Sequence, residues 1–394
     1  MERINGLVDK YQAKVEEYWH WLHAHPELSG QEEKSAEYIA AALREMGLEP
    51  IERIGGYGVV ALIEGAKPGK CVGLRADFDA LPVIELTGSE YASQNPGVCH
   101  ACGHDAHAAM LLGAAHILNE MKDELSGTVK LIFQPSEENP DISGARAMIA
   151  DGVLENPKVD AVIGQHVNPN IPTGNIKLGA GVRTAALDQF SITIYGKGAH
   201  ASSPHKSVDA IVVGAQVIIA LQSIVSRNVN PLDSAVLGIG KLNAGTVENV
   251  VASTCTMSGT CRNLSSQVRD EIIIKMESII KGIAEGMGAS YEFNYIKGYP
   301  PVVNDVAMND IINDAAVEIL GKEHVGAIET PALGGEDFAF YCEKVPGLIY
   351  RLGCAKEGAE FWPVHNGHFY PDEKALPVGV KVMVASALKF LAQE

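Results

Sequence analysis

The chain has 394 residues, of which 46% are hydrophobic and 20% charged, and its formal net charge at pH 7 is −18. This length exceeds the size at which single hydrophobic cores stop growing, so we expect two domains. The composition is that of a folded globular protein rather than a disordered one. The acidic balance argues against nucleic acid and anionic membranes as partners, because both would repel it.

The N-terminal residues and the cysteines bear on location. Residues 1–22, MERINGLVDKYQAKVEEYWHWL, contain no uninterrupted apolar run, so we expect no signal peptide. The longest apolar stretch, residues 210–225, is interrupted by Gln216 and Gln222; we expect it to be too short to cross a bilayer and to form a buried amphipathic helix. Seven scattered cysteines, an odd number, favour a reducing compartment over a disulfide framework. We therefore expect a cytoplasmic protein.

Helical and strand patterns alternate over the first 183 residues. One helix is predicted over 31–47, where Gly47 is a typical stop signal, and a second over 106–121. Short apolar runs rich in β-branched residues predict four strands, at 58–65, 71–76, 128–134 and 160–166. Strands that alternate with helices predict an α/β domain whose sheet has substantial parallel pairing.

The pattern changes between residues 184 and 297. Strands and helices there follow the order β-α-β-β-α-β, which is that of a ferredoxin-like α+β unit. Residues 298–394 then return to the α/β pattern, with a helix, the strand GLIYRLG and a last helix. We therefore predict an α/β domain in two parts, 1–183 and 298–394, with residues 184–297 inserted as a lid or assembly module.

The segment HACGHDAH, residues 100–107, is dense in side chains that bind metals. Cys102 and His104 are two residues apart in a turn that contains glycine, so both can reach one ion, and a thiolate with an imidazole suits zinc or a similar transition metal. One alternative is a helix start capped by Asp105, with packed or solvated histidines. Another is a catalytic thiol at Cys102 with a histidine base.

Acidic and histidine side chains also follow three of the predicted strands. Asp77 and Asp79 follow the strand 71–76, Glu137 and Glu138 follow 128–134, and His166 ends 160–166. Sites in open α/β sheets lie at the carboxyl ends of strands, so we expect these groups to meet the HACGHDAH segment. One glutamate of the pair can bind metal while the other acts as general base. The two aspartates are either turn formers or carboxylates that orient ligand histidines.

Two histidines near the end of the chain are further candidates. His365 and His368 lie in the loop sequence WPVHNGHFYPDE, just before a predicted helix. The residues predict that one of the two is a metal ligand and the other is not.

The inserted unit offers polar side chains in three short motifs. GKGAHASSPH contains His200 and His205, TVENVV contains Asn249, and GTCRN contains Arg262. Each could be a solvated surface residue. Together they could supply an oxyanion donor and a clamp for a substrate carboxylate.

In their order along the chain, these motifs resemble those of the aminoacylase and hippurate hydrolase family of di-metal amidohydrolases, which includes the plant indole-acetyl-amino-acid hydrolases. The resemblance covers nearly the whole chain: the opening segment 20–43 is followed by LRADFDALPVIE, HACGHDAHAAMLLGAA, FQPSEE, GQHV, GKGAHASSPH, GGEDF and HNGHF. It implies two divalent metal ions per subunit, Zn²⁺ or Mn²⁺, with Co²⁺ or Ni²⁺ as substitutes. The implied metal ligands are Cys102, His104, Glu138, His166 and His365.

The resemblance also implies roles for the remaining candidates. Glu137 would be the general acid/base, and His200 would reach the neighbouring subunit's site and polarise the scissile carbonyl. Asn249 and Arg262 would contact the substrate. The implied fold is a zinc-exopeptidase-like mixed sheet flanked by helices, with the inserted domain forming a homodimer, or through further contacts a tetramer.

The expected reaction is hydrolysis of an N-acyl amino acid to a carboxylic acid and a free amino acid. A dipeptidase or carboxypeptidase with the same centre is the alternative; a non-enzymatic binding protein would need a lost ligand or base, and no motif position is missing. The chain departs from the family pattern at Asn139-Pro140-Asp141-Ile142, where many relatives have glycines, and at His365-Asn366-Gly367, which usually reads His-Ser-Pro. Both departures border the expected pocket, which favours a shifted substrate preference.

Overall fold

The computed structural model describes residues 1–393 and divides the chain into two compact units. Unit 1 comprises Met1–Arg183, Val303–Thr330 and the chain from Asp337 onwards. Unit 2 comprises Thr184–Val302 and Pro331–Glu336. Unit 2 thus extends beyond Lys297, the expected end of the insertion, because its last strand continues to Tyr299.

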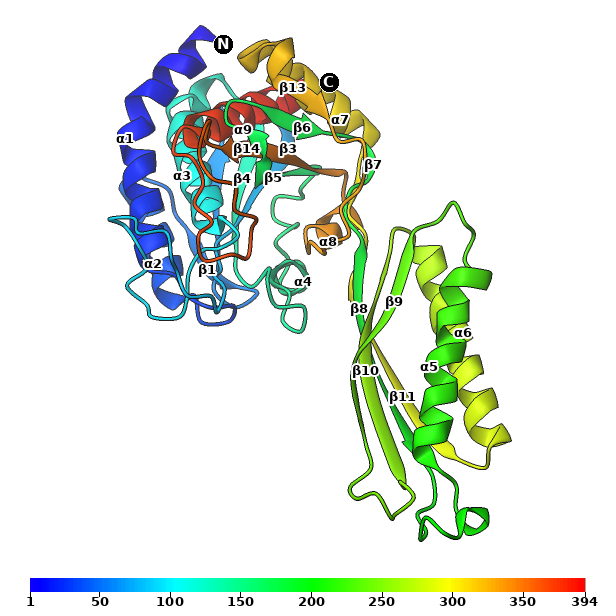
Figure 1. Ribbon diagram of the computed structural model, residues 1–394. Coiled ribbons are helices and arrows are strands. Elements are labelled where there is room, and N and C mark those ends of the chain that lie inside the picture. Colours follow the sequence, from blue (N-terminus) through cyan, green and yellow to red (C-terminus); the bar gives the residue numbers. More distant parts are fainter. Residues whose placement is uncertain (394) are drawn as a thin grey trace. The chain divides into compact units, whose positions relative to one another are not determined.

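Unit 1 is built on an eight-stranded mixed sheet (Figure 1). Its strand order is β1-β2-β4-β3-β5-β14-β6-β13. The strands, with the short pair β7 and β12, are β1 Ile51–Ile54, β2 Gly58–Glu64, β3 Lys67–Asp77, β4 Ser126–Gln134, β5 Ala161–Pro172, β6 Ile176–Leu178, β7 Gly181–Val182, β12 Val303–Asn304, β13 Val325–Ala327 and β14 Gly347–Ala355. The helices are α1 Glu2–Ala24, α2 Glu33–Glu45, α3 His104–Glu120, α4 Gly144–Ala150, α7 Val306–Leu320, α8 Ala339–Cys342 and α9 Ala375–Leu391, with 3₁₀ turns at Lys122–Glu124 and Lys322–His324.

The centre of this sheet is parallel, as the alternating pattern predicts. Strand β3 pairs with β4 on one side and with β5 on the other, and β5 pairs with β14, all in parallel. Helix α3 is buried along nearly its whole length because it packs among α1, α9 and the sheet, with Trp19, Leu112 and Met383 in one continuous core. The carboxyl ends of β3 and β4 therefore lie side by side on a rigid support.

One strand differs from its predicted bounds in a way that matters for the site. The sequence predicts that a strand ends at His166, whereas β5 continues to Pro172. The extension is held by parallel pairing with β14, which matches Arg351 to His166 and Gly353 to Asn168. His166 therefore projects from within a paired strand, where backbone hydrogen bonds fix its position.

Unit 2 is an α+β unit in which two helices cover one face of a four-stranded antiparallel sheet (Figure 1). The sheet order is β11-β8-β10-β9, and the elements follow the predicted β-α-β-β-α-β order. They are β8 Ala186–Tyr195, α5 Ala210–Arg227, β9 Ala235–Ala244, β10 Thr254–Asn263, α6 Ser266–Gly286 and β11 Ser290–Tyr299, with a 3₁₀ turn at Pro204–Lys206. This is the strand order of a ferredoxin-like fold.

Helix α5 covers the apolar stretch that the sequence places in a buried amphipathic helix. At 18 residues it is long and apolar enough to cross a bilayer by length and composition, contrary to the expectation that it is too short. However, Val213, Val217, Leu221 and Ile224 lie in the core of unit 2. Their spacing of three or four residues is that of a helix packed through one face.

Candidate metal centre

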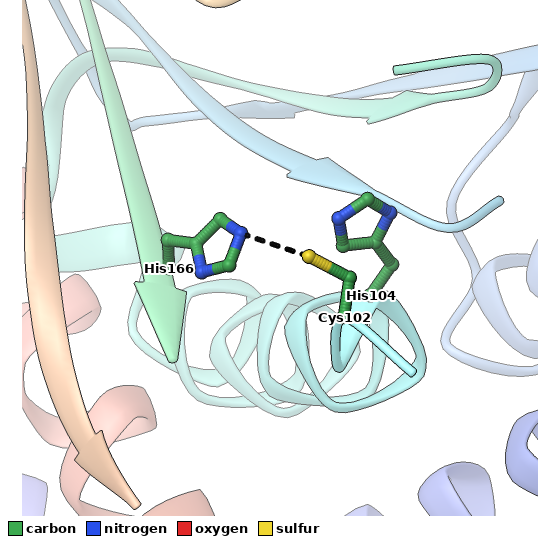
Figure 2. Close-up of side chains that lie close together, drawn as sticks. All are labelled: Cys102, His104 and His166. Carbon is green, nitrogen blue, oxygen red and sulfur yellow. Dashed lines mark hydrogen bonds between the residues drawn. The ribbon is translucent and has the colours of Figure 1, made fainter. Parts of the chain in front are cut away.

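The turn before α3 places two metal-binding side chains next to each other. Gly103 adopts φ +82°, and a Cβ at this position would lie 2.5 Å from Cγ2 of Val167, so only glycine fits without strain. Cys102 precedes this turn and His104 opens the helix. Figure 2 shows both side chains turned towards His166 on β5, and the Cys102 Sγ atom is 3.5 Å from Nε2 of His166.

A second set of potential ligands shares the same thiol. Cys102, Glu138 and His365 each offer one atom within 4.8 Å of the others, as do Cys102, His104 and His166. Glu138 Oε1 lies 3.2 Å from Nε2 of His365 and 3.9 Å from Nε2 of His104. One carboxylate oxygen thus faces two imidazole nitrogens.

His365 is held in an unusual backbone conformation. Its φ is +65°, in the left-handed region that non-glycine residues rarely adopt, and its backbone N–H donates to the carbonyl of Ala101 at 2.7 Å. Such strain is often found at functional sites. His368, the alternative candidate, instead stacks on Trp362 with 4.4 Å between ring centroids. The structure therefore brings His365, and not His368, to the other candidate ligands.

The five side chains fit two divalent cations. They provide one thiol, three imidazoles and one carboxylate, a donor set suited to zinc and similar metals. The Nε2 atom of His104 is buried and forms no hydrogen bond within residues 1–393. Because a buried polar nitrogen without a partner is costly, a bound cation would account for it.

Burial sets the protonation states of two candidate ligands, Cys102 and His166. Burial raises the pKa of the Cys102 thiol, and the nearby Glu138 carboxylate raises it further. A thiol held in this form is a poor nucleophile, which weakens the alternative of a catalytic cysteine, whereas a metal ion would stabilise the thiolate. Burial lowers the pKa of His166 well below 6.5, so this imidazole is neutral and able to bind metal.

Asp77 and Asp79 both orient histidines. Asp79 Oδ1 is 3.0 Å from Nδ1 of His104, and its other oxygen accepts hydrogen bonds from Ser29 Oγ and the backbone N–H of Glu138. Asp77 Oδ1 is 2.6 Å from Nδ1 of His107, whose Nε2 accepts the backbone N–H of Val167. Because both ring nitrogens of His107 are engaged, this histidine supports the strand at His166 rather than binding metal.

The helix-capping alternative for Asp105 does not hold. Gly103 occupies the N-cap of α3, and Asp105 is buried. Its Oδ2 atom instead accepts hydrogen bonds from Trp19 Nε1 at 2.8 Å and His23 Nδ1 at 2.6 Å. Asp105 therefore ties the turn that carries Cys102 and His104 to α1, which sequence reasoning did not anticipate.

Glu137 and Glu138 diverge as neighbouring side chains should. Glu138 joins the ligand set, while Glu137 is 7% exposed and accepts the backbone N–H of Asp337 through Oε1 at 3.4 Å. One oxygen of each glutamate and one nitrogen of His104 lie within 4.8 Å of one another. Glu137 therefore stands beside the ligands in a position suited to a general base.

Of the candidate residues in unit 2, His200 and Asn249 lie close together and Arg262 lies elsewhere. The segments around His200 and Asn249 pair, since the backbone N–H of Ala201 donates to the carbonyl of Asn249 at 3.0 Å and His200 bridges to Val250. His205 is exposed on the turn Pro204–Lys206 and joins no ligand group among the described residues.

Arg262 does not join the other unit 2 candidates. It lies near the far end of β10, the strand that begins shortly after Asn249, and its Nη1 donates to the carbonyl of Leu333 at 2.7 Å. At about 3.4 Å per residue, β10 places it roughly 27 Å from the His200 end of the sheet. Within a single unit 2, an extended strand therefore separates Arg262 from His200 and Asn249.

The fold and this centre define a metal-dependent hydrolase that acts on amide bonds. Residues 73–389 match the peptidase family M20/M25/M40, and the chain belongs to this family.

Several known proteins are similar to this chain over most of their length. The chain is 44% identical over 303 residues to an N-acyl-L-amino acid amidohydrolase of Geobacillus stearothermophilus, covering 77% of this chain and 81% of that one. It is 37% identical over 394 residues to thermostable carboxypeptidase 2 of Saccharolobus solfataricus, covering 98% and 99%. The crystal structure of the Bacillus subtilis YXEP protein, a dinuclear metal binding peptidase of the M20 family, superposes with a TM-score of 0.83 at 35% identity, covering 97% and 99%.

Proposed function

We propose that this protein hydrolyses N-acyl amino acids to a carboxylic acid and a free amino acid, with Glu137 as the general base. The observation that carries the proposal is the pair of ligand sets sharing Cys102, with the carboxylate of Glu137 beside them. The similarity to an N-acyl-L-amino acid amidohydrolase supports the substrate class.

In this proposal Cys102, His104, Glu138, His166 and His365 hold two divalent ions, for which we propose Zn²⁺ or Mn²⁺. When bound, the ions supply a water of lowered pKa and polarise the amide carbonyl. Glu137 takes the proton from the attacking water and transfers it to the leaving amine. Its burial keeps bulk water from competing for that proton.

We further propose that the enzyme works as a homodimer in which His200 serves the partner's site. The Nδ1 atom of His200 accepts the backbone N–H of Ser202 at 3.1 Å, so the neutral ring carries its proton on Nε2 and can donate to a developing oxyanion. Because Arg262 lies at the opposite end of the sheet, one unit 2 does not bring both residues to one small substrate. A partner subunit that supplies His200 and Asn249 would resolve this.

A cytoplasmic location is also part of the proposal. All seven cysteines are free, including the proposed ligand Cys102. A reducing compartment would keep them so.

A substrate panel with the metal-loaded enzyme tests the reaction. N-acetyl, N-benzoyl and longer N-acyl amino acids are compared with dipeptides that carry a free amino group and with N-blocked peptides. We expect kcat/KM to be highest for simple N-acyl amino acids. Preferential release of C-terminal residues from peptides would instead favour a carboxypeptidase, the activity named for the Saccharolobus solfataricus relative.

Subunit mixing tests the dimer. His200→Ala should lose about 10²–10³ in kcat, the usual value of one oxyanion donor, with metal content intact. Mixing it with Glu137→Gln subunits should restore part of the activity, since a heterodimer would contain one complete site. If no activity returns under conditions of subunit exchange, the role of His200 in the partner's site is wrong.

A further inference from the structure

The loop between β4 and α4 carries both glutamates of the site, and one buried carboxylate bonds to both of its ends. At the β4 end, Gln134 Nε2 donates to Asp337 Oδ1 at 2.8 Å. At the α4 end, Ser143 Oγ and the backbone N–H of Ala145 each donate to Asp337 Oδ2 at 3.0 Å. Asp337 comes from the GGEDF motif, residues 334–338, and it is 0% exposed.

Arg75 neutralises this carboxylate. Its Nη2 donates to Asp337 Oδ1 at 2.9 Å and its Nε to Gln134 Oε1 at 2.8 Å. Its Nη1 donates to Asp77 Oδ2 at 2.6 Å. All of these side chains are fully buried, where hydrogen bonds to charged groups are strong and an unpaired charge is costly. Asp337 is therefore held in one geometry.

The same residue reaches the proposed base directly. The backbone N–H of Asp337 donates to Oε1 of Glu137 at 3.4 Å. The bonds of Asp337 thus meet the glutamate loop at its start, at its end and at the carboxylate of Glu137 itself. A loop fixed at these three points has little freedom to turn that carboxylate away from the ligand set.

We propose that Asp337 is a positioning residue for Glu137: it closes the loop that carries the base and so keeps the base oriented for proton transfer. This inference rests on the proposed function, since it requires Glu137 to be the base. A side chain that only filled space at this position would not need two acceptor oxygens.

Asp337→Asn tests the inference because it changes one end of the loop selectively. The amide oxygen can still accept from Arg75 and Gln134, but the NH₂ group then faces the backbone N–H of Ala145, so two donors meet. We expect kcat to fall by up to about 100-fold, because a small misplacement of a catalytic group can cost that much, with KM and metal content unchanged. Ser143→Ala, which removes one donor to Asp337, should also lower kcat, but by a smaller factor. This variant replaces Asp337→Asn in the test if that variant does not fold.

A double-mutant cycle separates positioning from general damage. If Asp337 acts through Glu137, the Asp337→Asn change should cost little further activity in a Glu137→Gln background. Equal fold-losses in both backgrounds would overturn the positioning role while leaving the base assignment in place. Wild-type activity of Glu137→Gln alone would instead overturn the proposed base, and with it the inference.

Asp188→Asn is the matched control. Asp188 is likewise 0% exposed and accepts from the guanidinium of Arg269, from Tyr295 OH at 2.7 Å and from the backbone N–H of Gly298 at 3.0 Å, but it lies in unit 2. We expect this variant to lose thermal stability while its kcat stays at the wild-type value. A comparable loss of kcat in the control would show that any broken buried carboxylate impairs the enzyme, and the inference would fail.

Discussion

His23 offers a test of the buried electrostatics that join α1 to the turn carrying Cys102 and His104. The side chain is 2% exposed, and its two ring nitrogens lie 2.6 Å from Asp105 Oδ2 and 3.2 Å from Glu85 Oε1. Burial opposes the charged ring, but the two carboxylates outweigh it and raise the pKa of His23 from 6.5 to about 9. The folded protein therefore binds this proton more tightly than the unfolded chain does.

The sign and size of the effect follow from proton linkage. A raised histidine pKa contributes stability that is fully present below pH 6.5 and is lost as the pH rises through about 9. At about 1.4 kcal/mol per pH unit, this interval corresponds to about 3 kcal/mol in the free energy of unfolding. The loss should fall between pH 6.5 and pH 9.

Urea unfolding of the wild type and His23→Gln at several pH values between 6 and 10 measures this contribution. The difference in unfolding free energy between the two proteins should shrink by about 3 kcal/mol over this range. His116→Gln is a matched control, because burial lowers the pKa of His116 to about 4 and its contribution does not change above pH 6.5. A His23 resonance that titrates near 6.5 in NMR, or a difference that does not vary with pH, would refute the reasoning.

Three further predictions concern the site and its supporting loop. Chelation should abolish turnover and lower the melting temperature, and a divalent ion should restore both; full activity of the metal-free protein would revive a catalytic Cys102. Glu137→Gln should keep its metal and lose about 10²–10⁴ in kcat. Glu138→Gln should instead lose metal affinity, as measured by metal analysis. If the two phenotypes are swapped, the assignments of base and ligand are exchanged. Burial and the nearby Asp79 carboxylate raise the pKa of Glu32 from 4.5 to about 7. The free energy of unfolding should therefore fall by about 3 kcal/mol as the pH rises from 4.5 to about 7. Glu32→Gln should remove this pH dependence in urea titrations.

Local patterns in the sequence predicted most of the long central elements and the segments that carry the candidate ligands. Apolar periodicity predicted the central strands and α3, because each pattern depends on neighbours within the same segment. The HACGHDAH segment and the strand ends at Asp77 and Gln134 predicted where ligands would gather, since parallel strands deliver their carboxyl ends to one edge. The resemblance to a known family then singled out Glu138 as a ligand and Glu137 as the base.

Only the tertiary structure decided the relations between residues far apart in the chain. His365 rather than His368 meets Glu138 because a left-handed backbone and a bond to Ala101 place its ring beside that carboxylate. Asp337 lies 200 residues from Glu137 in sequence yet donates to it. The periodicity of apolar residues does not predict such pairs, because they form when separate segments pack together and their buried charged groups are paired. The sequence by itself thus determined which chemistry is present, and packing determined which side chains carry it out together.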